Sequence, residues 1–142
     1  MRGTIVCDVT DPLAGRTAAE FAGALATRLR LRLVLVHVVA VPPEEDVEAR
    51  TLDEVTRELA SDAELRLAVG DHVQSLARIA DEEGADLVVL GARPVGLGGR
   101  NFNGALAREL QAATPVPILV APPSTRRRSE RRLSAPAEVA AR

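Results

Sequence analysis

Lysine, tryptophan and tyrosine are absent from this 142-residue chain, and phenylalanine occurs only at positions 21 and 102. Without lysine the chain cannot build the P-loop, in which a lysine reaches the phosphates of a nucleotide. With aromatic residues at 1% of the chain, it has few side chains on which single-stranded bases could stack. The absences therefore exclude P-loop chemistry and argue against nucleic acid as a partner.

Cysteine and long apolar runs are scarce as well. The single cysteine, Cys7, excludes an internal disulfide. No apolar run approaches the roughly 18 residues of a membrane span, and the apolar start is too short for a signal peptide. We therefore expect no membrane contact and a cytoplasmic location. With 46% hydrophobic residues, a chain of this length can fold as one compact domain without a disulfide or metal.

The charge divides the chain after residue 122. Residues 1–122 carry 12 arginines and 18 acidic residues, whereas residues 123–142 carry 6 arginines and 2 acidic residues. Segments so poor in apolar side chains cannot offset the entropy lost on ordering. We predict a folded domain over 1–122 and a disordered, arginine-rich tail over 123–142. The tail could touch a polyanion or an acidic protein, although the acidic domain would repel polyanions.

Apolar runs alternate with helical patterns along the domain. Short β-branched or continuous apolar runs predict strands over residues 4–9, 31–39, 63–69, 86–91 and 116–121. Apolar spacing of three and four predicts helices after residue 11 and over residues 44–62, 71–84 and 104–113. This order predicts the α/β class, with a five-stranded, mainly parallel open sheet and helices on both faces.

Capping residues locate two of the helix starts. Asp11 followed by Pro12 is typical of a first helical turn, and Asp71 with Gln74 resembles a capping box. The first helix should place one apolar stripe on the sheet, namely Ala18, Phe21, Ala22, Leu25 and Leu29. The helix over 44–62 should carry a strongly acidic outer face.

Five glycines lie between positions 91 and 104, directly after a predicted strand and before a predicted helix. Such a segment can turn backbone N–H groups and a helix N-terminus toward a phosphate, or it can be a flexible loop. The spacing is not that of a dinucleotide-binding fingerprint. In open parallel sheets, ligands bind at the carboxyl ends of the strands, where the strand order reverses. We therefore examine the residues that follow the strands.

Four segments resemble the universal stress protein family. They are the strand at 5–9 with the helix after it, the run 33–38, the run 84–93 and the run 114–120. The resemblance covers residues 3–122 and implies a Rossmann-like fold of the adenine nucleotide alpha hydrolase-like type. It also implies a small binding and signalling module of the stress response.

The resemblance further implies an adenine nucleotide in the glycine-loop cleft, but the motif departs from the family pattern. Members that bind ATP carry Gly-x-x-Gly, nine residues and then Gly-Ser or Gly-Thr, where this chain has Pro94 and Ala105 in place of the second glycine and the hydroxyl residue. Proline has no N–H to offer a phosphate. Thr10 stands where those members have an aspartate, flanked by Asp8 and Asp11.

The match implies ATP or AMP as a weakly held ligand, with Mg²⁺ only if ATP binds. Asp8 and Asp11 could hold that Mg²⁺ beside a phosphate, or Asp11 could simply cap its helix. Arg93 would compensate by pairing with phosphate. The candidate ligand residues are Thr10, Asp11, Val38, Gly91, Arg93, Gly96, Gly98, Gly99, Gly104 and Ala105.

No nucleophile with a paired base is recognisable, so we expect at most slow ATP hydrolysis and assign no catalytic residue. His37 and His72 have no companions at metal-ligand spacing, and no metal site is expected. Cys7 should be a buried, inert thiol.

The last strand offers a second function. It is short and apolar, and an exposed sheet edge invites pairing. The resemblance implies a homodimer joined through Ile118, Leu119, Val120 and Ala121. The alternative to nucleotide binding is thus a nucleotide-free, dimerising stress-response protein that acts through partner contacts, by the acidic helix or the tail.

Overall fold

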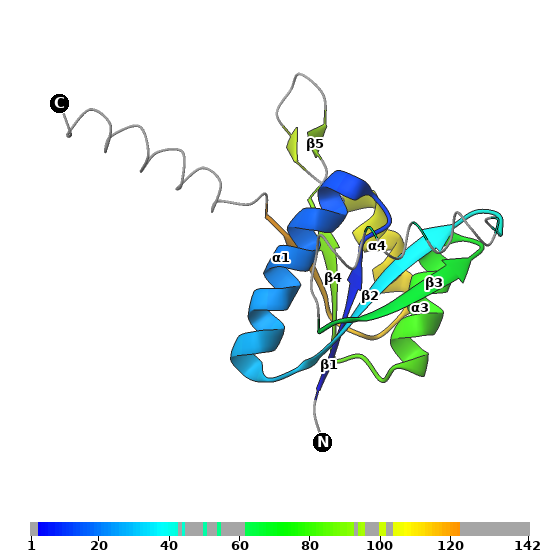
Figure 1. Ribbon diagram of the computed structural model, residues 1–142. Helices are drawn as coiled ribbons and strands as arrows, with labels where there is room; N and C mark the ends of the chain where they lie inside the picture. The colour runs from blue at the N-terminus through cyan, green and yellow to red at the C-terminus, as the bar shows by residue number, and fades with distance from the viewer. Residues whose placement is uncertain are drawn as a thin grey trace.

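A computed structural model describes residues 3–42, 62–92 and 104–122, together with residues 44, 50, 54, 94, 95, 100 and 101. Within these residues the chain forms three layers, a central sheet with helices on either side (Figure 1). The acidic helix predicted over 44–62 lies almost entirely outside the described residues, although Arg50 and Glu54 are helical. The predicted tail over 123–142 lies wholly outside them.

The sheet confirms the predicted class. Its five strands lie in the order β3-β2-β1-β4-β7, and every neighbouring pair is parallel. The strands are β1 (Thr4–Asp8), β2 (Arg32–Val39), β3 (Glu64–Val69), β4 (Leu87–Gly91) and β7 (Ile118–Ala121). The order reverses at β1, because β2 and β3 lie on one side of it and β4 and β7 on the other. The carboxyl ends of β1 and β4 are thus the place where such a sheet opens a crevice.

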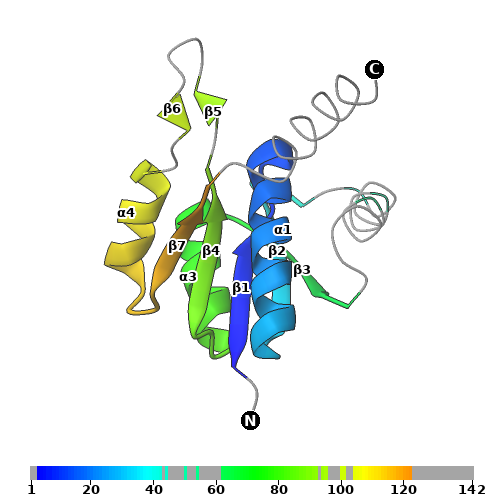
Figure 2. The same ribbon diagram turned by 90° about the vertical axis from the view of Figure 1, so that its left-hand side faces the viewer.

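The helices divide between the two faces of the sheet. Helix α1 (Pro12–Leu29) covers one face, and helices α3 (His72–Glu82) and α4 (Gly104–Ala113) cover the other (Figure 2). Along β1, Ile5 and Cys7 pack on the side of α1, and Val6 packs on the side of α3 and α4. Because both faces of the inner strands are buried, their sequences are continuously apolar.

Helix α1 begins and ends at identifiable residues. The carboxylate of Asp11 accepts hydrogen bonds from the backbone N–H of Leu13 at 3.0 Å and of Ala14 at 3.1 Å, which confirms the predicted N-cap. The helix stops at Arg30, whose φ of 54° is left-handed. Leu29, expected on the apolar stripe, is 59% exposed. The prediction was wrong there because the chain turns at Arg30, and Leu31 packs against the core instead.

The glycine-rich segment contains a small ribbon in place of an irregular loop. Strands β5 (Pro94–Val95) and β6 (Arg100–Asn101) pair antiparallel, with Pro94 opposite Asn101. The ribbon stands beyond the carboxyl edge of the main sheet, above the ends of β4 and α1 in Figure 1.

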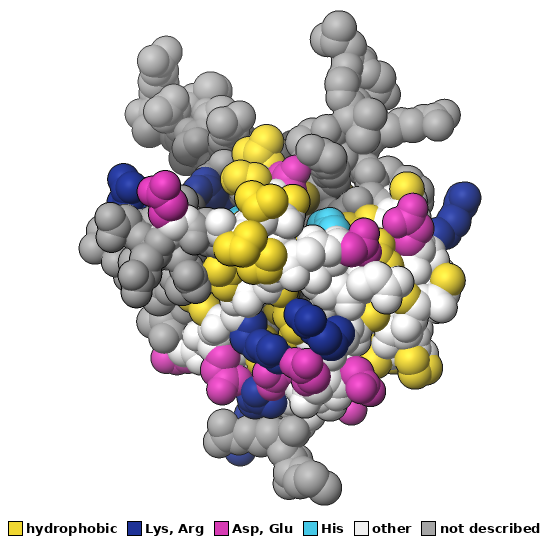
Figure 3. All heavy atoms as spheres, turned by 90° about the vertical axis from the view of Figure 1, so that its right-hand side faces the viewer, with side chains coloured by type: hydrophobic (Ala, Val, Ile, Leu, Met, Phe, Trp, Pro, Cys, Tyr) yellow, Lys and Arg dark blue, Asp and Glu magenta, His cyan; other side chains and the backbone are white. Residues whose placement is uncertain are grey.

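An ionic network joins β2 and β3 to the end of α3. Arg32 contacts Glu64 and Glu83, and Arg66 contacts Glu82 at 2.8 Å and Glu83 at 3.0 Å. Figure 3 shows basic and acidic side chains gathered together on this face of the molecule. Glu83 is the best buried member and serves both arginines, so the network ties β2 and β3 to α3 near the amino ends of the strands.

Candidate functional site

A cavity of about 330 Å³ lies at the carboxyl edge of the sheet, where the strand order reverses. The first turns of three helices, α1, α3 and α4, meet around it. Its lining residues are Asp8, Asp11, Ala14, Gly15, Asp71, His72, Val73, Gly91, Ala105, Leu106 and Glu109. Helix N-termini present backbone N–H groups without partners inside the helix, so this edge concentrates hydrogen-bond donors.

Asp8 is the centre of the polar contacts at this site. It is the last residue of β1, and only 6% of it is exposed. Its Oδ1 accepts hydrogen bonds from the backbone N–H and the hydroxyl of Thr10, at 3.1 and 2.5 Å, and its Oδ2 lies 2.8 Å from Nε2 of His72. Both carboxylate oxygens are therefore engaged.

The backbone of Val38 fixes the direction of these bonds. The N–H of Val38 donates to Oγ1 of Thr10 at 3.0 Å. The hydroxyl of Thr10 then has its one hydrogen left for Asp8, which acts as the acceptor. An ionised Asp8 in turn requires His72 to carry a hydrogen on Nε2. The hydrogen bonds among Val38, Thr10, Asp8 and His72 thus link β2, β1 and α3.

His72 lies partly open to solvent, with 37% of its side chain exposed. The hydrogen bond to Asp8 raises the pKa of His72 above its usual 6.5, and the charges of Asp8 and Asp71 act in the same direction against the cost of burial. A raised pKa means that the folded protein favours the imidazolium form.

Two of the three helix N-termini are capped by carboxylates. Asp11 caps α1, and Asp71 caps α3 by accepting from the N–H of Gln74 at 2.9 Å. Ala105 and Leu106 bring the first turn of α4 into the wall of the cavity. Since the caps of α1 and α3 oppose the positive ends of their helices, α4 is the natural place for an anion.

Close backbone packing fixes the floor of the cavity. A Cβ atom on Gly91 would lie 1.7 Å from the carbonyl oxygen of Ala14, and one on Gly15 would lie 2.7 Å from Cα of Val9. Glycine is therefore needed at both positions so that the first turn of α1 can rest on the ends of β1 and β4.

The structure brings some of the predicted ligand residues together. Asp11, Gly91 and Ala105 line the cavity, and Gly104 is buried beside them at the start of α4. Thr10 and Val38 join the site through Asp8. The remaining candidates, Arg93, Gly96, Gly98 and Gly99, lie outside the described residues.

Sequence reasoning considered Asp8 only as a possible Mg²⁺ ligand and did not place His72 at the site. The available signal for Asp8 is that a carboxylate ends an apolar strand, where burial demands partners. The partner, His72, lies 64 residues further along the chain, and only the fold brings the two together.

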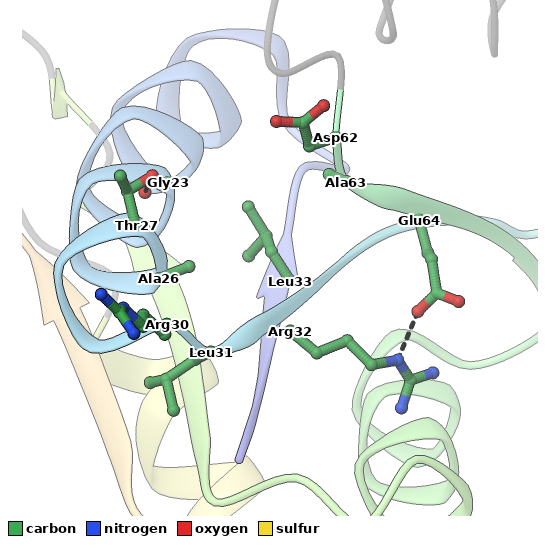
Figure 4. A pocket seen from close by; sticks show the side chains of 10 residues that line it. All are labelled: Gly23, Ala26, Thr27, Arg30, Leu31, Arg32, Leu33, Asp62, Ala63 and Glu64. Carbon is green, nitrogen blue, oxygen red and sulfur yellow. Dashed lines mark hydrogen bonds and ion pairs between the residues drawn. The ribbon is translucent and has the colours of Figure 1, made fainter. Parts of the chain in front are cut away.

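A second hollow, of about 630 Å³, lies at the opposite edge of the sheet, between the end of α1 and the starts of β2 and β3. Figure 4 shows Leu33 on its floor and Arg32 turned toward Glu64. Arg32 is engaged in the ionic network, and this hollow lies away from the carboxyl ends of the strands, where open parallel sheets bind their ligands.

Three further observations concern the cysteine, the possible metal ligands and the possible membrane spans considered from the sequence. Cys7 is buried, as predicted, and burial together with the charge of Asp8 raises the pKa of its thiol, which makes it unreactive. Among the described residues, no three His, Cys, Asp or Glu side chains come close enough to hold a metal ion. None of the helices that could be searched is long and apolar enough to cross a membrane.

Fold and site together define an α/β protein of the open-sheet type, with a cavity at the switch in strand order. The family model for the universal stress proteins matches residues 1–122, so the chain belongs to the universal stress protein family. A search of curated proteins found no match.

Solved structures agree with this assignment. A universal stress protein from Burkholderia pseudomallei is 26% identical, with a TM-score of 0.61, over 86% of this chain and 96% of that one. A universal stress protein in complex with cAMP is 23% identical, with a TM-score of 0.62, over 86% of this chain and 98% of that one. The Archaeoglobus fulgidus protein in complex with dAMP is 21% identical, with a TM-score of 0.57, over 84% and 97%.

Proposed function

We propose that this protein is a binding module that takes an adenine nucleotide in the cavity at the carboxyl edge. The observation that carries the proposal is the meeting of Gly91 and the first turn of α4 at the switch in strand order. A phosphate placed there would receive the N–H groups of α4. Two relatives of the same fold, crystallised with cAMP and dAMP, support the choice of ligand.

The charge of the cavity favours a nucleotide with one phosphate over ATP. Its described walls carry four carboxylates, Asp8, Asp11, Asp71 and Glu109, against one histidine, His72. A triphosphate brings up to four negative charges into this acidic surrounding, whereas a monophosphate can be balanced by one helix N-terminus and one imidazolium.

Binding and signalling suit this site better than turnover. A magnesium ion beside the phosphates of ATP would need free carboxylates. Asp8 already accepts hydrogen bonds at both oxygens, and Asp11 caps α1. Asp8 and Asp11, the two carboxylates suggested as Mg²⁺ ligands, are therefore already hydrogen-bonded within the protein.

Titration calorimetry with AMP, cAMP and ATP with Mg²⁺ tests the proposal. We expect AMP and cAMP to bind, and ATP to bind about tenfold more weakly, a difference of about 1.4 kcal/mol. Absence of heat with all three ligands at millimolar concentration would overturn the nucleotide function.

Dimerisation through β7 is the second candidate, and it is compatible with the first. β7 is an edge strand, and Ile118, Leu119 and Val120 are only partly buried within one copy of the described chain. A second copy that pairs with this edge would cover these side chains and the open backbone groups. Contacts through the acidic helix or the tail stay predictions.

A further inference from the structure

The Asp8–His72 pair gives the cavity a group whose charge changes near neutral pH. Nε2 of His72 lies 2.8 Å from Oδ2 of Asp8, and none of the described residues forms a hydrogen bond with the other ring nitrogen, Nδ1. In the neutral ring, Nε2 carries the hydrogen that Asp8 requires, so Nδ1 offers a lone pair. In the imidazolium ring, Nδ1 becomes a donor while the bond to Asp8 is kept.

We infer that His72 couples the binding of a phosphate group in this cavity to the uptake of a proton. This inference rests on the proposed function, since it names how the nucleotide site recognises its ligand. A phosphate oxygen accepts hydrogen bonds and cannot donate one when ionised. It is repelled by the lone pair of the neutral ring and attracted by the N–H of the imidazolium ring. Binding a phosphate therefore draws a proton onto Nδ1.

The other charged groups around His72 strengthen this coupling. From β1 it faces Asp8, from its own helix Asp71, and across the cavity Asp11 of α1 and Glu109 of α4. All four are acidic, so without a proton on His72 the described walls offer a phosphate no positive side chain. The hydrogen bond to Asp8, together with the charges of Asp8 and Asp71, raises the pKa of His72 above 6.5, which favours the imidazolium form.

Cyclic AMP is the appropriate probe, because its phosphodiester keeps one negative charge across the neutral range. AMP is less suitable, since its phosphate titrates near pH 6 and would contribute protons of its own. Calorimetry of cAMP binding in two buffers of different ionisation enthalpy gives the number of protons taken up directly. We expect little uptake at pH 6 and about 0.5 to 1 proton at pH 8, with affinity falling about tenfold per pH unit above the pKa of His72.

Three controls sharpen the experiment. Adenosine lacks the phosphate and should bind without proton uptake. His72→Gln should abolish the uptake with cAMP, because glutamine does not titrate. His37→Gln removes the only other histidine, which alternation along β2 places on the face of the sheet toward α1, and it should leave the uptake unchanged.

The outcomes separate this inference from the proposed function. If cAMP binds at pH 8 with no proton uptake, or if adenosine draws the same uptake, the role of His72 is refuted and the nucleotide site stands. If neither ligand binds at either pH, the nucleotide site itself is refuted. Should His72→Gln fail to fold, the titration of the His72 ring by NMR with and without cAMP decides, since bound cAMP must raise its pKa.

Discussion

Gly91 shows how much the cavity depends on single residues. In the family motif the first glycine belongs to the nucleotide loop, yet here a side chain at Gly91 would overlap the backbone of Ala14. The glycine is thus required by the packing of α1 on β4, whether or not a ligand is present. In the proposed nucleotide site, Gly91 allows the first turn of α1 to pack closely against the end of β4.

Gly91→Ala should destabilise the protein by about 3 kcal/mol or more, because backbone must move to admit the methyl group. Gly23→Ala is the matched control, since nothing lies within 4 Å of the added Cβ in the middle of α1. It should stabilise by about 0.5 to 1 kcal/mol through helix propensity. Chemical denaturation of both variants measures the two changes, and equal effects would contradict the packing argument.

The Asp8–His72 pair should also make stability depend on pH. Because the pKa of His72 is higher in the folded protein than 6.5, its contribution is fully present below pH 6.5 and is lost as pH rises through the folded pKa. We expect the loss to be under about 1 kcal/mol, since solvent reaches the ring.

Denaturation midpoints of the wild type and His72→Gln between pH 5.5 and 8.5 measure this contribution. The stability difference between them should shrink as pH rises. A difference that grows with pH would mean that the folded protein favours the neutral ring.

Among the elements, the edge strand β7 has backbone groups that face away from the sheet and could pair with a second chain. The carbonyl of Pro117 accepts from the N–H of Val88, and the carbonyl of Ala121 accepts from the N–H of Ala92. Alternation along the strand then turns the backbone groups of Leu119 toward β4 and those of Ile118 and Val120 outward. A second chain would pair with the outward groups.

Val120→Pro removes one outward N–H and no bond to β4, and proline is tolerated on edge strands in such a position. We expect a folded monomer where the wild type is a dimer, as measured by light scattering and circular dichroism. A Val120→Pro protein that stays dimeric would place the interface elsewhere. Val120→Thr, which keeps the N–H and the β-branched shape, should remain a dimer.

Over the whole molecule, the apolar periodicity and the helix-capping residues were enough to predict the fold class. The continuous apolar runs at β1, β2 and β4 follow from burial on both faces, and Asp11 located the start of α1. The switch in strand order then located the cavity. The sequence could not pair Asp8 with His72, because that contact depends on how β1 and α3 meet.

Local patterns were also insufficient in the glycine-rich segment. The ribbon of β5 and β6 has two residues in each strand, too few to show alternation. Its glycines are compatible with many backbone conformations, so composition predicted only a loop.

The central claim is that an adenine nucleotide binds in the cavity at the carboxyl edge of the sheet. It does not bind in the second hollow, which Arg30 lines at the end of α1. Two-dimensional NMR of the ¹⁵N-labelled protein titrated with cAMP tests it most directly. We predict that the amide signals of His72, Gly91, Ala105 and Leu106 shift together, while that of Arg30 does not. Shifts confined to Arg30 and its neighbours, or no shifts at millimolar cAMP, would contradict the account.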